Sequence, residues 1–179
     1  MTTNKELRND LSKKKVEEKS YLTRKCTIDD LELVKEVNEQ ELPEDYPFFF
    51  YKSILDNYPN SFLVACPKED PSKIIGYIMW RIERTPSQNN LRLVNKGHLV
   101  SIAVSKGYRR LGIASSLLLN SMPEIKKLTI SEYVLEVRVS NYGAISLYEG
   151  FDFKTEGIKK KYYRDGENAY FMVHKVKNS

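Results

Sequence analysis

The sequence contains little cysteine and no long apolar run, and each absence excludes a class of protein. Its two cysteines, Cys26 and Cys66, form neither a metal-binding spacing nor a disulfide framework, and no signal-peptide pattern precedes them. We therefore expect a reducing, cytoplasmic environment. The longest apolar stretches, such as residues 74–80, are far shorter than the roughly 20 residues that span a bilayer. No membrane segment is expected.

What the chain does contain is typical of one globular domain. Its 179 residues are 41% hydrophobic and 30% charged, with 8 glycines and 7 prolines, which excludes collagen-like and wholly disordered chains. This length allows one ordinary domain and a tail. The net charge of +5 suits phosphate-bearing or acidic partners without naming one.

The first 20 residues differ from the rest of the chain. Residues 4–19 mix charges of both signs with only Leu7, Leu11 and Val16 as apolar side chains. We interpret residues 1–20 as a charged, poorly ordered tail and residues 21–179 as the folded domain.

Hydrophobic periodicity in residues 21–179 predicts a mixture of strands and helices. A helix opens at a capping box in residues 27–30 and ends near Pro43, and a second ends near Tyr58. Residues 85–93 are predicted to be a polar loop that leaves the sheet. Pro123 is predicted to end the third helix. The predicted strands are 21–26, 61–66, 74–83, 97–104, 132–139, 154–163 and 169–176, and the last two helices are 113–122 and 141–149. A strand, a helix and another strand between residues 99 and 139 imply one parallel pair in an otherwise antiparallel sheet.

Residues 108–114, Tyr-Arg-Arg-Leu-Gly-Ile-Ala, connect the strand that ends at Val104 to a helix. Backbone N–H groups point outward at a helix N-terminus, and Gly112 and Ala114 allow a ligand to approach closely. Arg109 and Arg110 add positive charge. The pattern predicts a pyrophosphate site, although a capped turn with two solvated arginines fits the same residues.

Two segments in the right order resemble the GNAT acetyltransferases. Arg109, Gly112 and Ala114 match the Arg/Gln-x-x-Gly-x-Gly/Ala motif of that family, directly after a matching strand. Residues 135–153, which include Asn141 and Tyr148, match its second cofactor segment. The resemblance covers about residues 21–176. It implies an α/β (α+β) GNAT fold: a mixed, mostly antiparallel seven-stranded sheet with one splayed parallel pair, flanked by about four helices.

Within that superfamily, the sequence is most similar to archaeal and eukaryotic N-terminal acetyltransferase subunits of the NatA type. Residues 42–46, Leu-Pro-Glu-Asp-Tyr, resemble their Leu-Pro-Glu-Asn-Tyr loop, with Asp45 as a departure. Gly143 is a second departure. The resemblance implies transfer of acetyl from acetyl-CoA to the N-terminal amine of a protein by direct attack in a ternary complex. Substrates with a small first residue (Ser, Ala, Thr or Gly) are expected, and substrates that begin with Met are left as an alternative.

The resemblance also implies roles for individual residues. Glu136, at a position that is catalytic in this group, and His98 are the candidate bases, and Tyr148 is the expected proton donor to the departing thiolate. An α-amine has a pKa of about 7.7–8.0, so a weak base suffices. Contacts to acetyl-CoA are expected from Ile102, Ala103, Val104, Arg109, Arg110, Leu111, Gly112, Ile113, Ala114, Ser115, Asn141 and Tyr148. Contacts to the peptide are expected from Glu44, Tyr46, Tyr162 and Tyr163.

Several alternatives fit the same residues. Glu136 could be an exposed strand carboxylate and His98 a structural histidine, and these two ligands alone do not make a convincing zinc site. The enzyme could instead acetylate lysine side chains or small amines. The basic run 159–161 and the pI near 9.0 also suggest a third alternative, a nucleic-acid-binding module. No recognition motif supports this alternative. A monomer or weak dimer is expected, and any auxiliary subunit is left undetermined.

Overall fold

The computed structural model describes residues 19–86 and 92–176, and its elements follow the predicted order. Nearly all of the predicted tail, residues 1–18, lies outside the described residues. The strands are β1 (Tyr21–Lys25), β2 (Leu63–Pro67), β3 (Gly76–Pro86), β4 (Leu93–Val104), β5 (Glu132–Arg138), β6 (Lys154–Lys159) and β7 (Ala169–Lys175). The helices are α2 (Leu31–Glu41), α3 (Phe48–Asn57), α4 (Ile113–Lys126) and α5 (Tyr142–Glu149).

All seven strands belong to one sheet in the order β1-β2-β3-β4-β5-β7-β6. Neighbouring strands are antiparallel except β4 and β5, which are parallel. The parallel pair follows from the crossover through α4, because a helix is long enough to return the chain to the same end of the sheet. The predicted fold class, a mostly antiparallel seven-stranded sheet with one parallel pair and four flanking helices, is confirmed.

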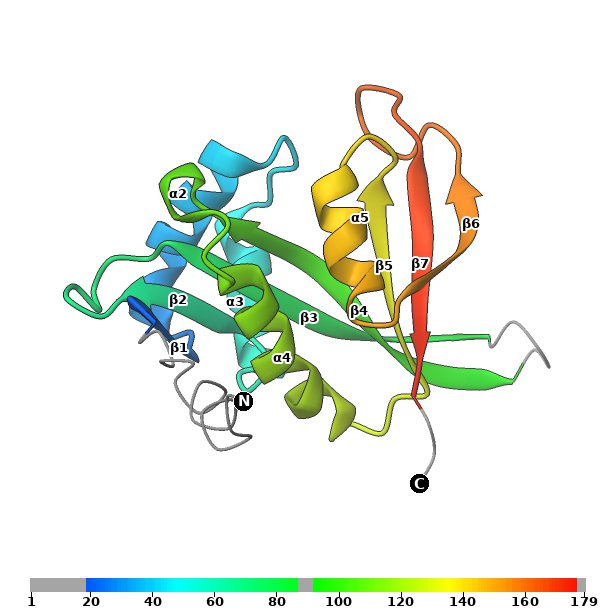
Figure 1. The fold of residues 1–179 in the computed structure, drawn as a ribbon. Helices are drawn as coiled ribbons and strands as arrows, with labels where there is room; N and C mark the ends of the chain where they lie inside the picture. The colour runs from blue at the N-terminus through cyan, green and yellow to red at the C-terminus, as the bar shows by residue number, and fades with distance from the viewer. Residues whose placement is uncertain (1–18, 87–91, 177–179) are drawn as a thin grey trace, which may run out of the picture.

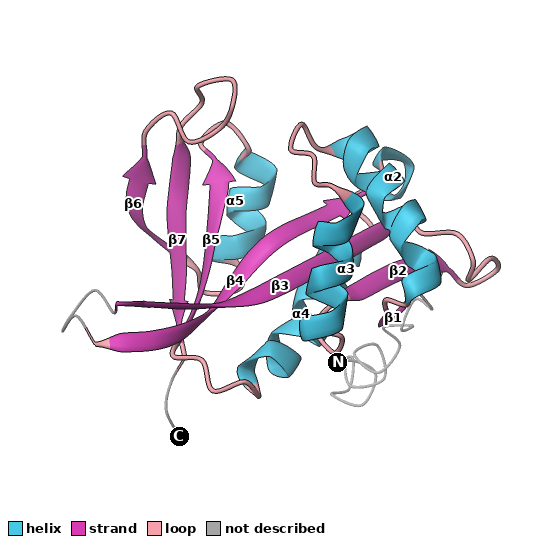
Figure 2. Cartoon of the chain, turned by 180° about the vertical axis from the view of Figure 1, so that it is seen from behind, coloured by secondary structure: helices cyan, strands magenta, loops and turns pink. Residues whose placement is uncertain are grey.

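Helices cover both faces of the sheet (Figures 1 and 2). α2 and α3 pack on one face, and α4 packs on the other, where α5 lies beside β5. The alternation of side chains along β3 supplies both cores. Tyr77 and Met79 are buried toward α2 and α3, whereas Ile78 and Trp80 are buried toward α4.

The parallel strands β4 and β5 separate after a short ladder. Their pairing runs from Lys96↔Glu132 to His98↔Val134, and the strands diverge beyond that point (Figure 1). In the part of the chain that the structure describes, residues 99–104 of β4 pair only with β3. The opposite edge of β4 therefore offers backbone N–H and C=O groups to an extended ligand.

A β-bulge lies in β4 at the point of separation. Met79 pairs with Ser101 and Trp80 pairs with Leu99, so Val100 is the extra residue. Val100 and Ser101 consequently both face α2 and α3, where the Ser101 and Tyr77 hydroxyls lie 2.7 Å apart. The bulge changes which face each side chain of β4 occupies between the two halves of the strand.

Two predicted boundaries were wrong because tertiary packing outweighed local signals. Residues 85–93 were predicted to be a polar loop, but Pro86 and Leu93 are paired at the end of the β3–β4 hairpin, and only residues 87–91 lie outside the described residues. Pro123 was predicted to end α4, yet the helix continues to Lys126. Pro123 is exposed, and the Ile125 side chain that follows it is fully buried in the core.

The last hairpin is also shorter than predicted. β6 ends at Lys159 instead of continuing to Tyr163, because Lys161 has a positive φ of 51° and leaves the extended conformation. α5 ends at Glu149 as predicted, and Gly150, which follows it, keeps a helical φ of −64°. The left-handed residue after α5 is Asp152, with φ 62°.

Candidate active site

The predicted anion-binding loop lies between β4 and α4. Arg110 and Gly112 have positive φ values of 67° and 78°, and Gly112 directly precedes the first residue of α4. A Cβ on Gly112 would lie 3.6 Å from the Tyr21 hydroxyl, an ordinary contact, so the left-handed backbone, rather than crowding, requires glycine there. Ile113 is the first residue of α4, so its backbone N–H has no acceptor within the helix and can serve a ligand. This geometry fits the pyrophosphate of CoA.

Arg109 ties this loop to the last residue of α2. Its Nη2 lies 2.5 Å from Glu41 Oε2 and its Nε donates to the Val104 carbonyl at 3.0 Å. Glu41 Oε1 accepts the backbone N–H of Lys106 at 3.0 Å. Both arginines of the loop are exposed, and the charge of Arg109 is paired with Glu41 of α2. No motif pointed to Glu41 as a partner of this loop.

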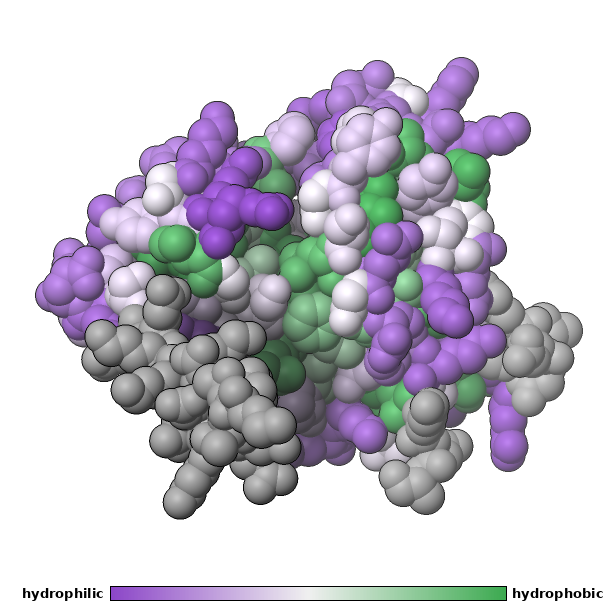
Figure 3. Space-filling view, in the orientation of Figure 1, coloured by the Kyte–Doolittle hydropathy of each residue, from purple (hydrophilic) through white to green (hydrophobic). Residues whose placement is uncertain are grey.

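The end of β4 offers mainly its backbone to a ligand. Ile102 and Val104 are partly buried toward the α4 face, and Ala103 is buried toward α2 and α3. Figure 3 shows apolar surface in the hollow between the α4 side and the α5 side of the molecule. Ala114 and Ser115, in the first turn of α4, are half-buried next to the loop.

The structure brings the two predicted bases together. Glu136 alternates with the buried Leu135 and Val137, and it lies on the α2 and α3 face, as does His98. His98 Nε2 lies 2.6 Å from Glu136 Oε2. The His98 side chain is 11% exposed and that of Glu136 is 8% exposed, so water screens this pair poorly. Glu136 is not an exposed strand carboxylate.

A second carboxylate, which the sequence patterns did not indicate, completes the histidine environment. His98 Nδ1 lies 2.7 Å from Glu83 Oε1, and Arg81 contacts the same oxygen. Burial alone would lower the pKa of His98, but its hydrogen bonds to Glu136 and Glu83 outweigh burial and raise that pKa above 6.5. The hydrogen bond from His98 lowers the pKa of Glu83 to about 2. Both ring nitrogens donate only in the imidazolium form.

The other oxygen of Glu136 contacts a lysine. Lys159 Nζ forms an ion pair with Glu136 Oε1, while His98 holds Oε2. Burial would raise the pKa of Glu136, but the hydrogen bonds from His98 and Lys159 lower it below its ordinary value. Lys159 belongs to the basic run 159–161, so this lysine points to a carboxylate and not outward to a nucleic acid.

Arg138 joins the two loops that were predicted to bind the peptide. Its Nη2 lies 2.5 Å from Glu44 Oε1, in the loop between α2 and α3. Its Nη1 contacts Asp165 and Glu167, each at 2.7 Å, in the loop between β6 and β7. The guanidinium also lies 4.0 Å from the centre of the Tyr163 ring. These contacts hold the α2–α3 and β6–β7 loops across the end of β5.

Buried hydrogen bonds fix the position of the first loop. Asn38, on α2, is fully buried, donates to the Glu44 carbonyl at 2.6 Å and accepts from the Tyr77 hydroxyl at 2.5 Å. Tyr46 stacks on Phe50 at 4.9 Å, and its hydroxyl lies 3.5 Å from the Val100 carbonyl in the bulge. The loop is thus attached to β3, β4 and α3.

The aromatic run 48–51 does not act as one unit. Tyr51 is fully buried, whereas Phe49 is 73% exposed. In the other peptide loop, Tyr162 and Tyr163 form a T-shaped pair with centroids 5.1 Å apart. Burial raises the pKa of Tyr162 to about 12, so this hydroxyl stays protonated at neutral pH.

Tyr148 lies on α5, and Asn141 is the residue directly before this helix. α5 lies beside the gap between β4 and β5 (Figure 1). Tyr148 is buried, and burial raises its pKa, so its phenol carries a proton at neutral pH. The Asn141 side chain accepts the Ala144 N–H at 3.2 Å and caps α5. Its predicted contact to the pantetheine arm stays a prediction.

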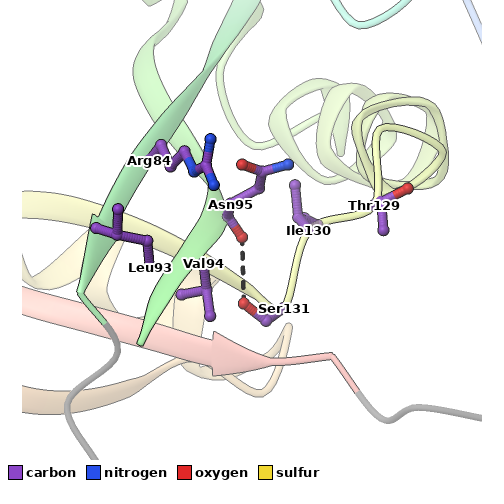
Figure 4. Close-up of a pocket in the computed structure, with 7 residues that line it drawn as sticks. All are labelled: Arg84, Leu93, Val94, Asn95, Thr129, Ile130 and Ser131. Atoms are coloured by element: carbon purple, nitrogen blue, oxygen red, sulfur yellow. Dashed lines mark hydrogen bonds between the residues drawn. The ribbon is translucent and has the colours of Figure 1, made fainter. Parts of the chain in front are cut away.

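Other features of the described residues lie apart from this site. A hollow at the start of β4 is lined by Arg84, Leu93, Val94, Asn95, Thr129, Ile130 and Ser131 (Figure 4). It lies at the other end of β4 from the Gly112 loop and contains none of the predicted site residues. Among the described residues, no group of three or more His, Cys, Asp and Glu side chains is arranged to hold a metal ion. None of the described helices combines the length and the hydrophobicity that crossing a membrane requires.

The splayed parallel strands, the anion loop after β4 and the buried acid–base pair define an acyl-CoA-dependent transferase. The model of the acetyltransferase (GNAT) family matches residues 27–153, and the chain belongs to this family. It is an N-acetyltransferase, and acetyl-CoA is its acetyl donor.

Relatives of known name support this assignment over most of the chain. The chain is 43% identical over 167 residues to a Sulfolobus acidocaldarius protein named N-alpha-acetyltransferase, covering 90% of this chain and 95% of that protein. It is 34% identical over 152 residues to the N-terminal acetyltransferase A complex catalytic subunit ard1 of Schizosaccharomyces pombe, covering 83% of this chain and 82% of that protein. The resemblance to the NatA type is confirmed.

Solved structures agree on the fold. A chain in the crystal structure of the NatC complex bound to Gag peptide and CoA superposes with a TM-score of 0.80 at 23% identity. The match covers 88% of this chain and 99% of that chain. At this identity the likeness shows the fold alone, and it agrees with the family assignment.

Proposed function

We propose that this N-acetyltransferase acetylates the N-terminal α-amine of proteins and prefers small first residues. The observation that carries the proposal is the buried His98–Glu136 pair below two loops that Arg138 holds together. Two loops that are joined in this way suit an extended peptide end and disfavour a lysine within a folded loop. The names of the relatives support the same substrate class.

The reaction that we propose is a direct attack. The neutral α-amine forms a bond to the acetyl carbonyl carbon, and the carbon–sulfur bond to CoA breaks. Glu136 takes the amine proton, directly or through one water, and His98 shares it across the 2.6 Å contact. Tyr148 gives a proton to the thiolate. The backbone N–H groups of residues 102–104 polarise the acetyl carbonyl.

Each part of the site has a separate proposed task. The loop from Arg109 to Ser115 holds the CoA pyrophosphate with backbone N–H groups, and Asn141 contacts the pantetheine arm. Glu44, Tyr46, Tyr162 and Tyr163 line the peptide entrance. The base-competent form of the pair has a neutral His98 and an ionised Glu136, so the rate rises with pH through the raised pKa of His98.

The cellular setting follows from the same chemistry. We propose that residues 21–179 form one cytoplasmic domain that acts as a monomer or weak dimer on other proteins. Cys26 and Cys66 are both buried free thiols, which supports a reducing compartment.

A peptide panel tests the proposal. Purified protein, acetyl-CoA and peptides that differ only in the first residue are mixed, and CoA release is measured. We expect faster release with Ser, Ala, Thr and Gly than with bulky first residues. N-terminally blocked peptides that contain lysine should release little CoA, and equal turnover of blocked and free peptides would overturn the proposal.

A substitution at Glu136 tests its role as the base. Glu136→Gln keeps the shape of the side chain and removes its capacity to take a proton. We expect kcat to fall about 100-fold or more, in the range of general-base contributions, with acetyl-CoA affinity unchanged. An unchanged kcat at neutral pH would remove Glu136 from the mechanism.

A further inference from the structure

Lys159 places an ammonium group directly on the proposed catalytic carboxylate. Its Nζ pairs with Glu136 Oε1 and lies 4.9 Å from the centre of the Phe171 ring and 5.3 Å from that of Tyr162. The Glu136 side chain is 8% exposed, whereas that of Lys159 is 44% exposed. The ammonium group of a half-exposed lysine is therefore ion-paired with a buried carboxylate.

The sheet register explains how a lysine two strands away reaches Glu136. Glu136 pairs with Phe171 on β7, and Phe171 pairs with Gly157 on β6. Alternation places Lys159 on the same face as Gly157, two residues further along β6. Phe171 lies between β5 and β6 on this face, and the Lys159 ammonium lies 4.9 Å from its ring centre, so the Lys159 side chain extends over Phe171 toward β5.

A peptide α-ammonium needs the same position as the Lys159 ammonium. Glu136 Oε2 is held by His98 at 2.6 Å, so Oε1 is the oxygen that can receive an incoming amine. Two ammonium groups at one oxygen repel each other, and burial strengthens the repulsion. The substrate amine and Lys159 therefore exclude each other at Glu136.

We propose that Lys159 is a built-in competitor of the substrate amine, which occupies Glu136 until a bound peptide displaces it. The inference rests on the proposed role of Glu136 as the amine-binding base. Because Lys159 is half-exposed, its charged end can move into solvent when it is displaced. A peptide that also contacts the loops joined by Arg138 supplies binding energy for this displacement, and a small free amine does not. Lys159 is thus a specificity-determining residue that disfavours small amines.

Steady-state kinetics test the competition. Lys159→Met keeps much of the apolar stem and removes the ammonium, and Lys160→Met is the matched control because the neighbouring Lys160 is exposed. With a Ser-initiated peptide, we expect Lys159→Met to lower the peptide KM about threefold, within the range for half-exposed ion pairs, with little change in kcat. Lys160→Met and Lys159→Arg should keep the wild-type KM. An unchanged or higher KM for Lys159→Met would overturn the inference.

A binding measurement without turnover separates competition from a structural effect. Peptides with a fluorophore at the C-terminus are titrated in the presence of CoA, one with a free N-terminus and one N-acetylated. We expect Lys159→Met to bind the free peptide more tightly and the acetylated peptide as the wild type does. An equal change for both peptides would contradict the inference. Lys159→Gln provides a second uncharged variant if Lys159→Met folds poorly by circular dichroism.

The two proposals fail in different ways. If the wild-type protein releases no CoA with any free peptide, the proposed function fails. If the wild type is active but Lys159→Met shows no gain specific to the free amine, only the role of Lys159 fails.

Discussion

The Arg109 guanidinium lies 2.5 Å from the Glu41 carboxylate, which joins the loop before α4 to the last residue of α2. The next residues along the chain, 42–46, belong to the loop between α2 and α3. The same carboxylate accepts the Lys106 N–H. One side chain therefore connects the segments that are proposed to hold the two substrates.

Removing this connection should weaken acetyl-CoA binding. In Glu41→Gln, Arg109 and Lys106 lose an ionised partner, and the loop before α4 becomes less well ordered. We expect the KM for acetyl-CoA to rise about two- to fivefold, because half-exposed ion pairs contribute about 0.2–1 kcal/mol. Glu39→Gln, on the same helix but paired with Lys35, is the control and should leave this KM unchanged. Equal KM values for the two variants would show that the Glu41 bridge is dispensable.

Glu83 should set the pH at which the enzyme becomes active. Its contact to His98 Nδ1 favours the imidazolium, and the active pair requires a neutral imidazole. In Glu83→Gln the pKa of His98 falls, so the acidic limb of the kcat/KM profile should move to lower pH. Profiles of wild type and variant measured from pH 5 to 9 check this direction. If the acidic limb stays in place or moves to higher pH, Glu83 does not control the pKa of the base.

Arg138 should control peptide affinity and not acetyl-CoA affinity. Lysine keeps the charge but cannot reach Glu44, Asp165 and Glu167 together or stack on Tyr163. We expect Arg138→Lys to raise the peptide KM about tenfold, since hydrogen bonds to charged groups contribute about 1.5–3 kcal/mol. Arg164→Lys, in the same β6–β7 loop, is the control. A rise in the acetyl-CoA KM of similar size would point to a general loss of structure.

Gly76 should be intolerant of a side chain because of the strand that it faces. A Cβ on Gly76 would lie 3.0 Å from the Ala103 carbonyl and 3.3 Å from Val104 Cγ2. We expect Gly76→Ala to lower the free energy of unfolding by about 1–3 kcal/mol, as overpacking does, and to raise the acetyl-CoA KM by moving β4. Gly157→Ala has open space around its Cβ and should change stability by less than about 1 kcal/mol. Thermal unfolding and kinetics of both variants test the contrast, and equal stabilities would contradict it.

Local patterns were sufficient for much of the fold and for the outline of the site. Strands with alternating residues, such as β5, and the glycine before α4 are recognisable because their signals lie within a few residues of each other. Pro123 and the polar residues 85–93 were misleading because burial of Ile125 and pairing in the β3–β4 hairpin outweigh local preference. The placement of His98 beside Glu136 was anticipated as a possibility, and the structure shows it.

The sequence by itself determined the order of elements, the loop with Gly112 before α4 and the two candidate bases. Only the tertiary structure decided which charges surround them: Glu83 and Lys159 at the acid–base pair and Glu41 on Arg109. Each of these partners is separated from its target by 15 to 68 residues. Ion pairs at such separations depend on strand register and helix placement, and no local pattern of residue types encodes them.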